Sequence, residues 1–181
     1  MIVFISGGAK NGKSSLAQDL AVALAAGRRH YYVATMIPSD DEDIDRIRHH
    51  RADREGMGFK TVECGRDILS CLPQVDKSAT FLLDSATALL LNELFPDPTG
   101  GEMDVLAAER CARDLVTFAQ SVENLVIVSD YIYSDAARYD ALTETYRACL
   151  AKIDRMLAQV SDTVIEVTAG TYTLHKGEMP T

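Results

Sequence analysis

The chain is poor in positive charge and has no long apolar run. Its 181 residues include 18 Lys and Arg against 27 Asp and Glu, a formal net charge of −9. A general nucleic-acid-binding protein needs a basic face, so this balance argues against that function class. Small nucleotides are not excluded, because a single loop and its metal hold them locally. No apolar stretch approaches the ~20 residues of a membrane span, so we expect none.

Cysteine is also scarce and shows no paired spacing. None of the four cysteines forms a C-x-x-C motif; they are Cys64, Cys71, Cys111 and Cys149. This usage is typical of free thiols in a reducing compartment. No charged leader precedes the first apolar run, so we expect no secretory signal and a cytoplasmic location. The length predicts a single domain over residues 1–181 with a sizeable core.

A phosphate-binding motif stands near the start of the chain. The segment Gly7-Gly8-Ala9-Lys10-Asn11-Gly12-Lys13-Ser14 reads G-x-x-x-x-G-K-S, the P-loop pattern. Its glycines let successive backbone N–H groups point at phosphate oxygens, and the dipole of a following helix favours an anion. Lys13 can reach the β- and γ-phosphates, and the Ser14 hydroxyl can ligate Mg²⁺. A chance glycine-rich turn is the weaker reading, because every fixed position matches.

Strand-like apolar runs alternate with helical patterns along the chain, with no internal repeat. Strands are predicted at residues 2–6, 31–34, 60–63, 80–83, 125–129, 163–167 and 172–175. Helices are predicted at residues 14–26, 41–54, 85–94, 103–122 and 141–160, with a loop at 96–101 and an acidic helix start at Glu102. Such alternation implies crossover connections and a mostly parallel sheet with helices on both faces.

The motif and the alternation together predict an α/β fold of the P-loop NTPase type. Its three layers are α/β/α, and the sheet is mostly parallel. Only Ala169 and Gly170 separate the last two predicted strands. That connection is too short for a crossover, so the last strand should pair antiparallel at an edge of the sheet.

Polar residues follow three of the predicted strands and should gather beside the P-loop. They are Thr35, Asp84 and Asp130, and active sites in such sheets lie at the carboxyl ends of the strands. Asp84 ends an apolar run, as a Walker-B acid does, and is a candidate Mg²⁺ ligand. A helix N-cap is the alternative for Asp84 that the sequence leaves open. For Asp130 we predict capping or substrate contact.

A second informative region, residues 40–54, reads DDEDIDRIRHHRADR. Acidic residues come first and basic residues later, which suits a helix dipole and is also typical of a solvated surface helix. The adjacent His49 and His50, however, are surrounded by arginines. Guanidinium groups bind phosphate, and neutral imidazole is a nucleophile toward phosphorus. A metal site is less favoured, because adjacent histidines point to different helix faces.

The chain resembles the bifunctional adenosylcobinamide kinase/adenosylcobinamide-phosphate guanylyltransferases of cobalamin assembly. Five stretches in the family's order carry the resemblance: ISGGAKNGKSS, YYVAT, DRIRHHRADR, FKTVEC and LLDSATALLLNELF. The P-loop alone would be unspecific, and its combination with RIRHHR is much more specific. Members phosphorylate the aminopropanol hydroxyl of adenosylcobinamide with ATP or GTP. They then transfer GMP from GTP to the new phosphate through a phosphoramidate on histidine.

The resemblance implies roles for individual residues. It implies His50 as the guanylate acceptor and Lys13 as a catalytic residue of the P-loop. The implied nucleotide-binding residues are Gly7, Gly8, Ala9, Lys10, Asn11, Gly12, Lys13, Ser14, Ala34, Thr35, Met36, Arg51, Ala52, Asp53, Arg54, Glu63 and Asp84. The expected metal ligands are Ser14 and Asp84, with Mg²⁺ as the cofactor. The expected partners are GTP or ATP, a corrinoid and further copies of the chain in a trimer.

The second half departs from the family pattern. Ser129-Asp130-Tyr131-Ile132-Tyr133-Ser134 stand where members have an Asn-Glu-Val-Gly loop followed by Gly-Ile-Val-Pro. The helix that follows departs as well, over residues 146–155. This region is expected to face the corrinoid, so two alternatives stay open. One is a P-loop kinase of another small metabolite without guanylyl transfer, and the other is a non-catalytic nucleotide-binding regulator.

Overall fold

A seven-stranded sheet organises residues 1–97, 103–133 and 135–180, which the structure, a computed structural model, describes. The strands are β1 (Ile2–Gly7), β2 (His30–Ala34), β3 (Lys60–Glu63), β4 (Thr80–Asp84), β5 (Asn124–Asp130), β6 (Thr163–Thr168) and β7 (Thr171–Lys176). Their order across the sheet is β3-β2-β4-β5-β1-β6-β7. All neighbours pair in parallel except β6 and β7, which pair antiparallel at the edge.

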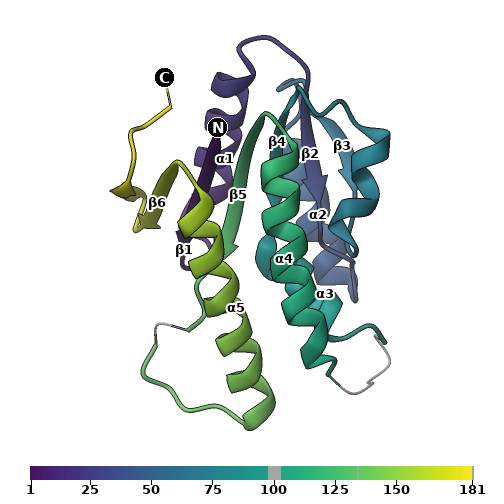
Figure 1. Cartoon of the computed structure of the whole chain (residues 1–181), viewed down its shortest axis with the longest axis vertical. Coiled ribbons are helices and arrows are strands. Elements are labelled where there is room, and N and C mark those ends of the chain that lie inside the picture. Colours follow the sequence, from purple (N-terminus) through teal and green to yellow (C-terminus); the bar gives the residue numbers. More distant parts are fainter. Residues whose placement is uncertain (98–102, 134, 181) are drawn as a thin grey trace.

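Helices cover both faces of this sheet. They are α1 (Lys13–Ala25), α2 (Asp41–Asp53), α3 (Ala86–Leu94), α4 (Val105–Ser121) and α5 (Ala141–Val160), with a short 3₁₀ helix η1 (Ile68–Gln74). In Figure 1, α4 and α5 lie in front of the sheet and α1 lies behind it. Along β1 the side chains alternate, so that Val3 and Ile5 belong to the core beneath α1 while Phe4 belongs to the opposite core.

The larger core lies between the sheet and the helices α3, α4 and α5. Aromatic rings mark its centre: Phe81 stacks on Tyr31 at a centroid distance of 5.0 Å and meets Phe118 of α4 edge-on at 5.7 Å. Central parallel strands are buried on both faces and therefore read as continuous apolar runs, as residues 81–83 do.

The predicted fold is confirmed, including the antiparallel last strand. The sequence did not reveal η1, because seven residues with Pro73 inside show no helical period. The helix predicted from residue 103 begins at Val105, since the side chain of Asp104 accepts a hydrogen bond from the Ala107 N–H and so caps it. Most of the predicted loop at 96–101, and the helix start at Glu102, lie outside the described residues.

The charged segment forms α2 as predicted, but this helix packs on neither face of the sheet. None of its side chains is buried. Its N-cap is Asp40, whose carboxylate accepts the Asp43 N–H at 2.9 Å. Within the described ranges, no helix is both long and apolar enough to cross a membrane.

Replacing Leu115 by alanine should destabilise the fold. Leu115 is fully buried in the core beneath α4. Its loss should lower the free energy of unfolding by about 2–5 kcal/mol, because lost burial and a residual cavity add up. The matched control is Leu106→Ala in the same helix, where the side chain is 71% exposed and the change should stay within about 0.5 kcal/mol. Urea denaturation measures both, and equal effects would contradict the assignment of this core.

Candidate functional site

The P-loop joins β1 to α1 through backbone conformations that need glycine. Gly12 is the N-cap of α1 and has φ of +87°, which L side chains rarely adopt. At Gly7 the constraint is space, since a Cβ atom there would collide with the carbonyl oxygen of Val167 on β6. The glycines therefore set the loop's shape and its close packing on the neighbouring strand.

Lys13 is buried and has two partners. Its Nζ donates to the Gly8 carbonyl at 2.6 Å and forms an ion pair with Asp130 Oδ1 at 2.7 Å. The side chain of Lys13 is only 5% exposed, so this ammonium is held inside the site. Parallel pairing of β1 with β5 places Gly7 opposite Asp130, which brings the carboxylate to the loop.

The capping role predicted for Asp130 is wrong, since Asp140 caps α5. Sequence reasoning also missed the ion pair of Asp130 with Lys13. No local sequence pattern predicts this ion pair, because it depends on the pairing of β1 with β5.

The three polar residues at the strand ends lie at one edge of the sheet, as predicted, but they differ in how exposed their side chains are. Thr35 is fully buried, and its Oγ1 donates to the Ser85 carbonyl and accepts the Ser85 N–H. Its side chain therefore ties β2 to the end of β4 and does not face a ligand. The N-cap of α3 is Ser85, whose hydroxyl oxygen accepts the Ala88 N–H. The capping alternative for Asp84 is thus wrong, and its carboxylate faces the cavity described next.

One cavity of about 1180 Å³ extends from the P-loop to α2. The candidate site residues that line it are Ala9, Lys10, Asn11, Gly12, Lys13, Ser14, Ala34, Met36, His50, Arg51, Asp53, Arg54, Glu63 and Asp84. Four candidates are not in this lining: Gly7, Gly8, Thr35 and Ala52. The cavity thus brings the anion-binding loop and the histidine-bearing helix to the same space.

Tyr32 links the end of α2 to Asp84, which the sequence did not reveal. Its hydroxyl donates to Asp84 Oδ2 at 2.9 Å, and the Arg54 guanidinium lies over its ring, 3.4 Å from the centroid. Burial, and next the Asp84 carboxylate, raise the pKa of Tyr32, so the hydroxyl stays protonated and donates. A tyrosine inside an apolar strand is expected to be a core residue, so only the structure shows that Tyr32 contacts Asp84 and Arg54.

The two adjacent histidines both line the cavity but differ in their partners. His49 Nδ1 lies 2.8 Å from the Asp45 carbonyl, which can only accept, so that nitrogen carries a proton. Among the described residues, His50 Nδ1 and Arg54 Nη1 are buried without a hydrogen-bond partner. Buried polar atoms rarely stay unpaired, so these two are candidates for contact with a ligand.

The metal-ligand candidates Ser14 and Asp84 both offer oxygen atoms to the cavity. Over the described ranges, no group of three or more His, Cys, Asp and Glu side chains could hold a metal ion. A hard ion such as Mg²⁺ does not need an all-protein cage, because it is commonly bound by one or two side chains plus substrate phosphates. This pair of residues fits that arrangement.

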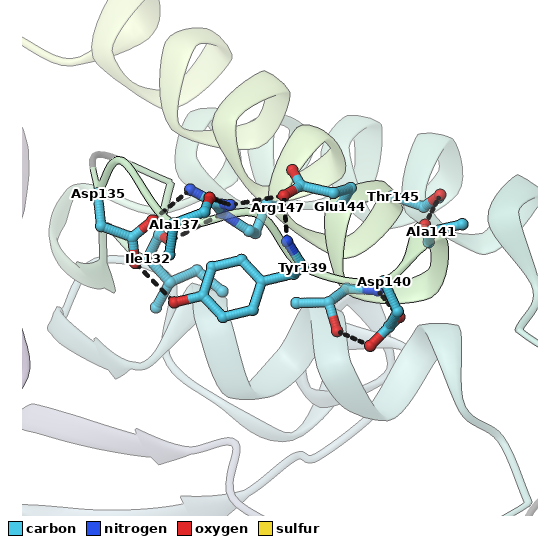
Figure 2. Close-up of polar contacts among 10 residues, drawn as sticks. Ile132, Asp135, Ala137, Tyr139, Asp140, Ala141, Glu144, Thr145 and Arg147 are labelled. Atoms are coloured by element: carbon cyan, nitrogen blue, oxygen red, sulfur yellow. Dashed lines mark hydrogen bonds and ion pairs between the residues drawn. The ribbon is translucent and has the colours of Figure 1, made fainter.

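The segment after β5, where the sequence departs from the family pattern, is organised by one buried arginine (Figure 2). The Arg147 guanidinium donates to the carbonyl oxygens of Ile132 and Ala137, and it forms ion pairs of 2.8 Å with Asp135 and Glu144. It also lies over the Tyr139 ring at 4.8 Å. The position of Ser134 in this segment lies outside the described residues.

A buried acid lies behind the end of β5. Asp154 of α5 is 4% exposed and accepts hydrogen bonds from the Ser129 and Tyr133 hydroxyls at 2.7 and 2.8 Å. Burial raises the pKa of Asp154 to about 6, and it outweighs these hydrogen bonds, which act in the opposite direction. The carboxyl therefore keeps its proton to a higher pH than an ordinary aspartate does.

Comparison with known proteins identifies relatives along nearly the whole chain. The family model described as "Cobinamide kinase / cobinamide phosphate guanyltransferase" matches residues 3–174. The "Bifunctional adenosylcobalamin biosynthesis protein CobU" of Salmonella typhimurium is 28% identical, with 94% of this chain and 97% of the relative covered. The protein of the same name from Escherichia coli is 26% identical over the same shares.

Solved structures with this fold are distant in sequence. The flagellar accessory protein FlaH from Methanocaldococcus jannaschii aligns with a TM-score of 0.52 and 13% identity, covering 99% of this chain and 79% of that one. A solved ATPase domain aligns with a TM-score of 0.50 and 12% identity, covering 91% of this chain and 68% of that one. These likenesses support the fold alone.

Replacing Asp154 by asparagine should change how stability depends on pH. The folded pKa of about 6 lies above the ordinary value of 3.8, so the folded protein binds this proton more tightly than the unfolded chain. The contribution of this group to the free energy of unfolding is therefore greatest below the unfolded pKa and falls as the pH rises through the folded pKa. In total it falls by about 3 kcal/mol. In the Asp154→Asn variant this decrease in the free energy of unfolding should be absent. Urea unfolding measured from below pH 3.8 to above pH 6 tests this.

The control is Asp140→Asn, because accepted hydrogen bonds from Thr143 lower the pKa of Asp140. That carboxylate stabilises the fold above its unfolded pKa, so its removal should change the slope in the opposite sense. If Asp154→Asn and wild type show parallel curves, the buried titrating carboxyl is contradicted.

Proposed function

The chain belongs to the cobinamide kinase / cobinamide phosphate guanyltransferase family, and we propose that a single cavity serves both of that family's reactions. It is an enzyme of cobalamin biosynthesis with kinase and guanylyltransferase activity. The metabolite-kinase and regulator alternatives are not favoured, because the family match includes the P-loop, α2 and the departing segment after β5. The proposal assigns both reactions to one domain, residues 1–181.

One observation carries this proposal: the P-loop and α2 line the same cavity of about 1180 Å³. A triphosphate whose β- and γ-phosphates rest on the loop would extend its α-phosphate and nucleoside toward α2. The nucleoside side of the proposed site uses Ala34, Thr35, Met36, Arg51, Ala52, Asp53, Arg54 and Glu63. Thr35 and Ala52 are not in the lining of the cavity, so in this proposal they hold the neighbouring residues Ala34 and Asp53 in place and do not touch the nucleotide.

In the kinase step, the chain positions a phosphate and neutralises its charge. Phosphoryl transfer needs little covalent help, so loop N–H groups and Lys13 act by holding the phosphates and stabilising developing charge. Ser14 and Asp84 would hold Mg²⁺, which neutralises phosphate charge when bound. Tyr32 fixes one oxygen of Asp84 and leaves the other for this purpose. The acceptor is the aminopropanol hydroxyl of adenosylcobinamide.

In the guanylyl step, His50 is the proposed nucleophile. Its ring nitrogen forms a bond to the α-phosphorus of GTP, the bond from that phosphorus to the bridging oxygen breaks, and pyrophosphate leaves with the electron pair. A phosphate oxygen of adenosylcobinamide phosphate then forms a bond to the same phosphorus, the phosphorus–nitrogen bond breaks, and the electron pair returns to the His50 ring. The buried, unpartnered Nδ1 of His50 and Nη1 of Arg54 support this role, because a bound nucleotide would supply partners for them.

Assembly and location complete the proposal. A homo-oligomer, with a trimer implied by the resemblance, would let neighbouring subunits complete the corrinoid side of the site. The cytoplasmic location expected from the sequence also stays a prediction.

His50→Ala should abolish covalent guanylylation and spare phosphorylation. Incubation of the wild type with GTP labelled on the α-phosphate should give an acid-labile, base-stable label that maps to the peptide with His50. The label should disappear in the variant, while phosphate transfer to adenosylcobinamide continues. His49→Ala is the matched control and should keep the label. A label on His49, or no label on the wild type, would refute the assignment of His50.

Tyr32→Phe should weaken Mg²⁺-dependent nucleotide binding while leaving the ring beneath Arg54 in place. It removes only the hydroxyl that donates to Asp84 Oδ2. The Mg²⁺ concentration needed for half-maximal nucleotide binding should rise about tenfold, which corresponds to one hydrogen bond to a charged group. Calorimetric titration of nucleotide at several Mg²⁺ concentrations measures this. An unchanged Mg²⁺ requirement would mean that Asp84 needs no support from Tyr32.

A further inference from the structure

We propose that Asp130 is a catalytic residue of the kinase step and accepts the proton of the acceptor hydroxyl. The inference rests on the kinase reaction proposed above. It concerns a residue at a position where the sequence departs from the family pattern. Four features of the site carry it: the fixed backbone of Asp130, the partners of its carboxylate, its place beside Lys13 and the different partners of Asp84.

The backbone of Asp130 is fixed at the edge of the P-loop. Its N–H donates to Thr87 Oγ1 at 2.8 Å. The next N–H, that of Tyr131, donates to the Gly7 carbonyl at 3.2 Å. In the parallel register of β1 and β5, Gly7 and Asp130 lie opposite each other. The carboxylate is therefore held by a strand end, and its position does not depend on the long loop that follows.

The carboxylate itself is only half engaged. Its Oδ1 pairs with Lys13 Nζ at 2.7 Å, and among the described residues Oδ2 accepts no hydrogen bond. The Asp130 side chain is 25% exposed and lines the same cavity as the P-loop. A carboxylate with one free oxygen facing the cavity can accept a proton there, provided the substrate hydroxyl reaches it.

The position beside Lys13 is what places this carboxylate near the reacting phosphate. The lysine of a P-loop contacts the β- and γ-phosphates of a bound nucleotide. A group that forms a 2.7 Å ion pair with Lys13 therefore lies one contact away from the transferred phosphoryl group. When the phosphates bind Lys13, they compete with Asp130 for the ammonium, and the carboxylate becomes available to the acceptor.

Two carboxylates line this cavity from neighbouring strands, and their partners differ. Asp84 pairs in register with Val128, two residues before Asp130. Asp84 accepts a hydrogen bond from the neutral Tyr32 hydroxyl, whereas Asp130 faces the Lys13 ammonium. We therefore assign the metal side of the phosphates to Asp84 and the acceptor side to Asp130.

The proposed step balances without a further reactant. The acceptor oxygen forms a bond to the γ-phosphorus, and the bond from that phosphorus to the β,γ-bridging oxygen breaks. The electron pair leaves with the nucleoside diphosphate. The hydroxyl proton passes to the Asp130 carboxylate, and it is released to solvent when the products leave.

Asp130→Asn tests the proposal, because it keeps the shape of the side chain and removes its basicity. We expect kcat for phosphorylation of adenosylcobinamide to fall about 10²–10⁴-fold, the range for loss of a general base. The Kd for ATP or GTP with Mg²⁺ should stay equal or decrease, because a negative charge beside the triphosphate is gone. Labelling of His50 by α-labelled GTP should persist. A merely structural role would instead change Kd and labelling together with kcat.

Glu123→Gln is the matched control, at the residue immediately before the other end of β5. Glu123 forms an exposed ion pair with Arg28 at 3.0 Å, so its loss should leave both activities unchanged. Asp130→Ser serves as a second variant, and thermal unfolding checks that each variant folds. Near-wild-type kcat in either folded variant would overturn the proposal.

Two further outcomes would also overturn it. A weakened Kd that accounts for the whole loss of activity would make Asp130 a positioning residue for Lys13, and a raised Mg²⁺ requirement would make it a metal ligand. If the wild type itself fails to phosphorylate adenosylcobinamide, the proposed function fails and the role of Asp130 fails with it. An active wild type with an unimpaired Asp130→Asn variant contradicts the role of Asp130 alone.

Discussion

The parallel pairing of β1 with β5 is the constraint on which the site depends. It runs in register from Ile2 opposite Leu125 to Gly7 opposite Asp130, so both strands end at the same edge of the sheet. Because every connection among the six parallel strands crosses over, the turns that leave their carboxyl ends also meet there. The P-loop, the end of β4 and the end of β5 are thus brought together by strand order. The apolar layers on both faces only need to keep that order fixed.

The helix α2 shows a different way of placing functional groups. It has no buried side chain, and its cap and charge order suit a helix that stands in water. Its attachment to the site comes from its C-terminal end, where the buried Arg54 lies on the Tyr32 ring. Aromatic stacking of a guanidinium holds a charged group in place without burying an apolar face. The histidines can therefore line the cavity on a helix that contributes little to the core.

The sequence predicts features that have a local pattern, and it does not predict features that depend on the order of the strands in the sheet. Local signatures predict the P-loop, the strands and the carboxylate of Asp84. The P-loop and Asp84 lie at the carboxyl ends of β1 and β4, as expected. The Lys13–Asp130 pair and the Tyr32–Asp84 hydrogen bond have no local signature. The first joins the start of α1 to the end of β5 and the second joins β2 to β4, and the fold alone makes these elements neighbours. Thr35 shows a limit of residue type: a polar residue after a strand suggests a side-chain contact with a ligand, yet its hydroxyl forms hydrogen bonds with the backbone of Ser85. Polar residue type predicts a need for partners but not which partners supply it.

The segment after β5 and the P-loop are held in place by different residues. A connection of irregular backbone needs partners for its carbonyl groups, and here Arg147 supplies them for Ile132 and Ala137 while neutralising Asp135 and Glu144 (Figure 2). One buried guanidinium thus sets the conformation of this connection, and it does so from α5. The P-loop is set independently, by Gly7 against β6 and by Gly12 at the start of α1. Only Asp130 belongs to both, since it begins the connection and pairs with Lys13. Substitutions beyond Asp130 therefore act on Arg147 and its partners, whereas a change at Asp130 itself alters the charge that faces Lys13.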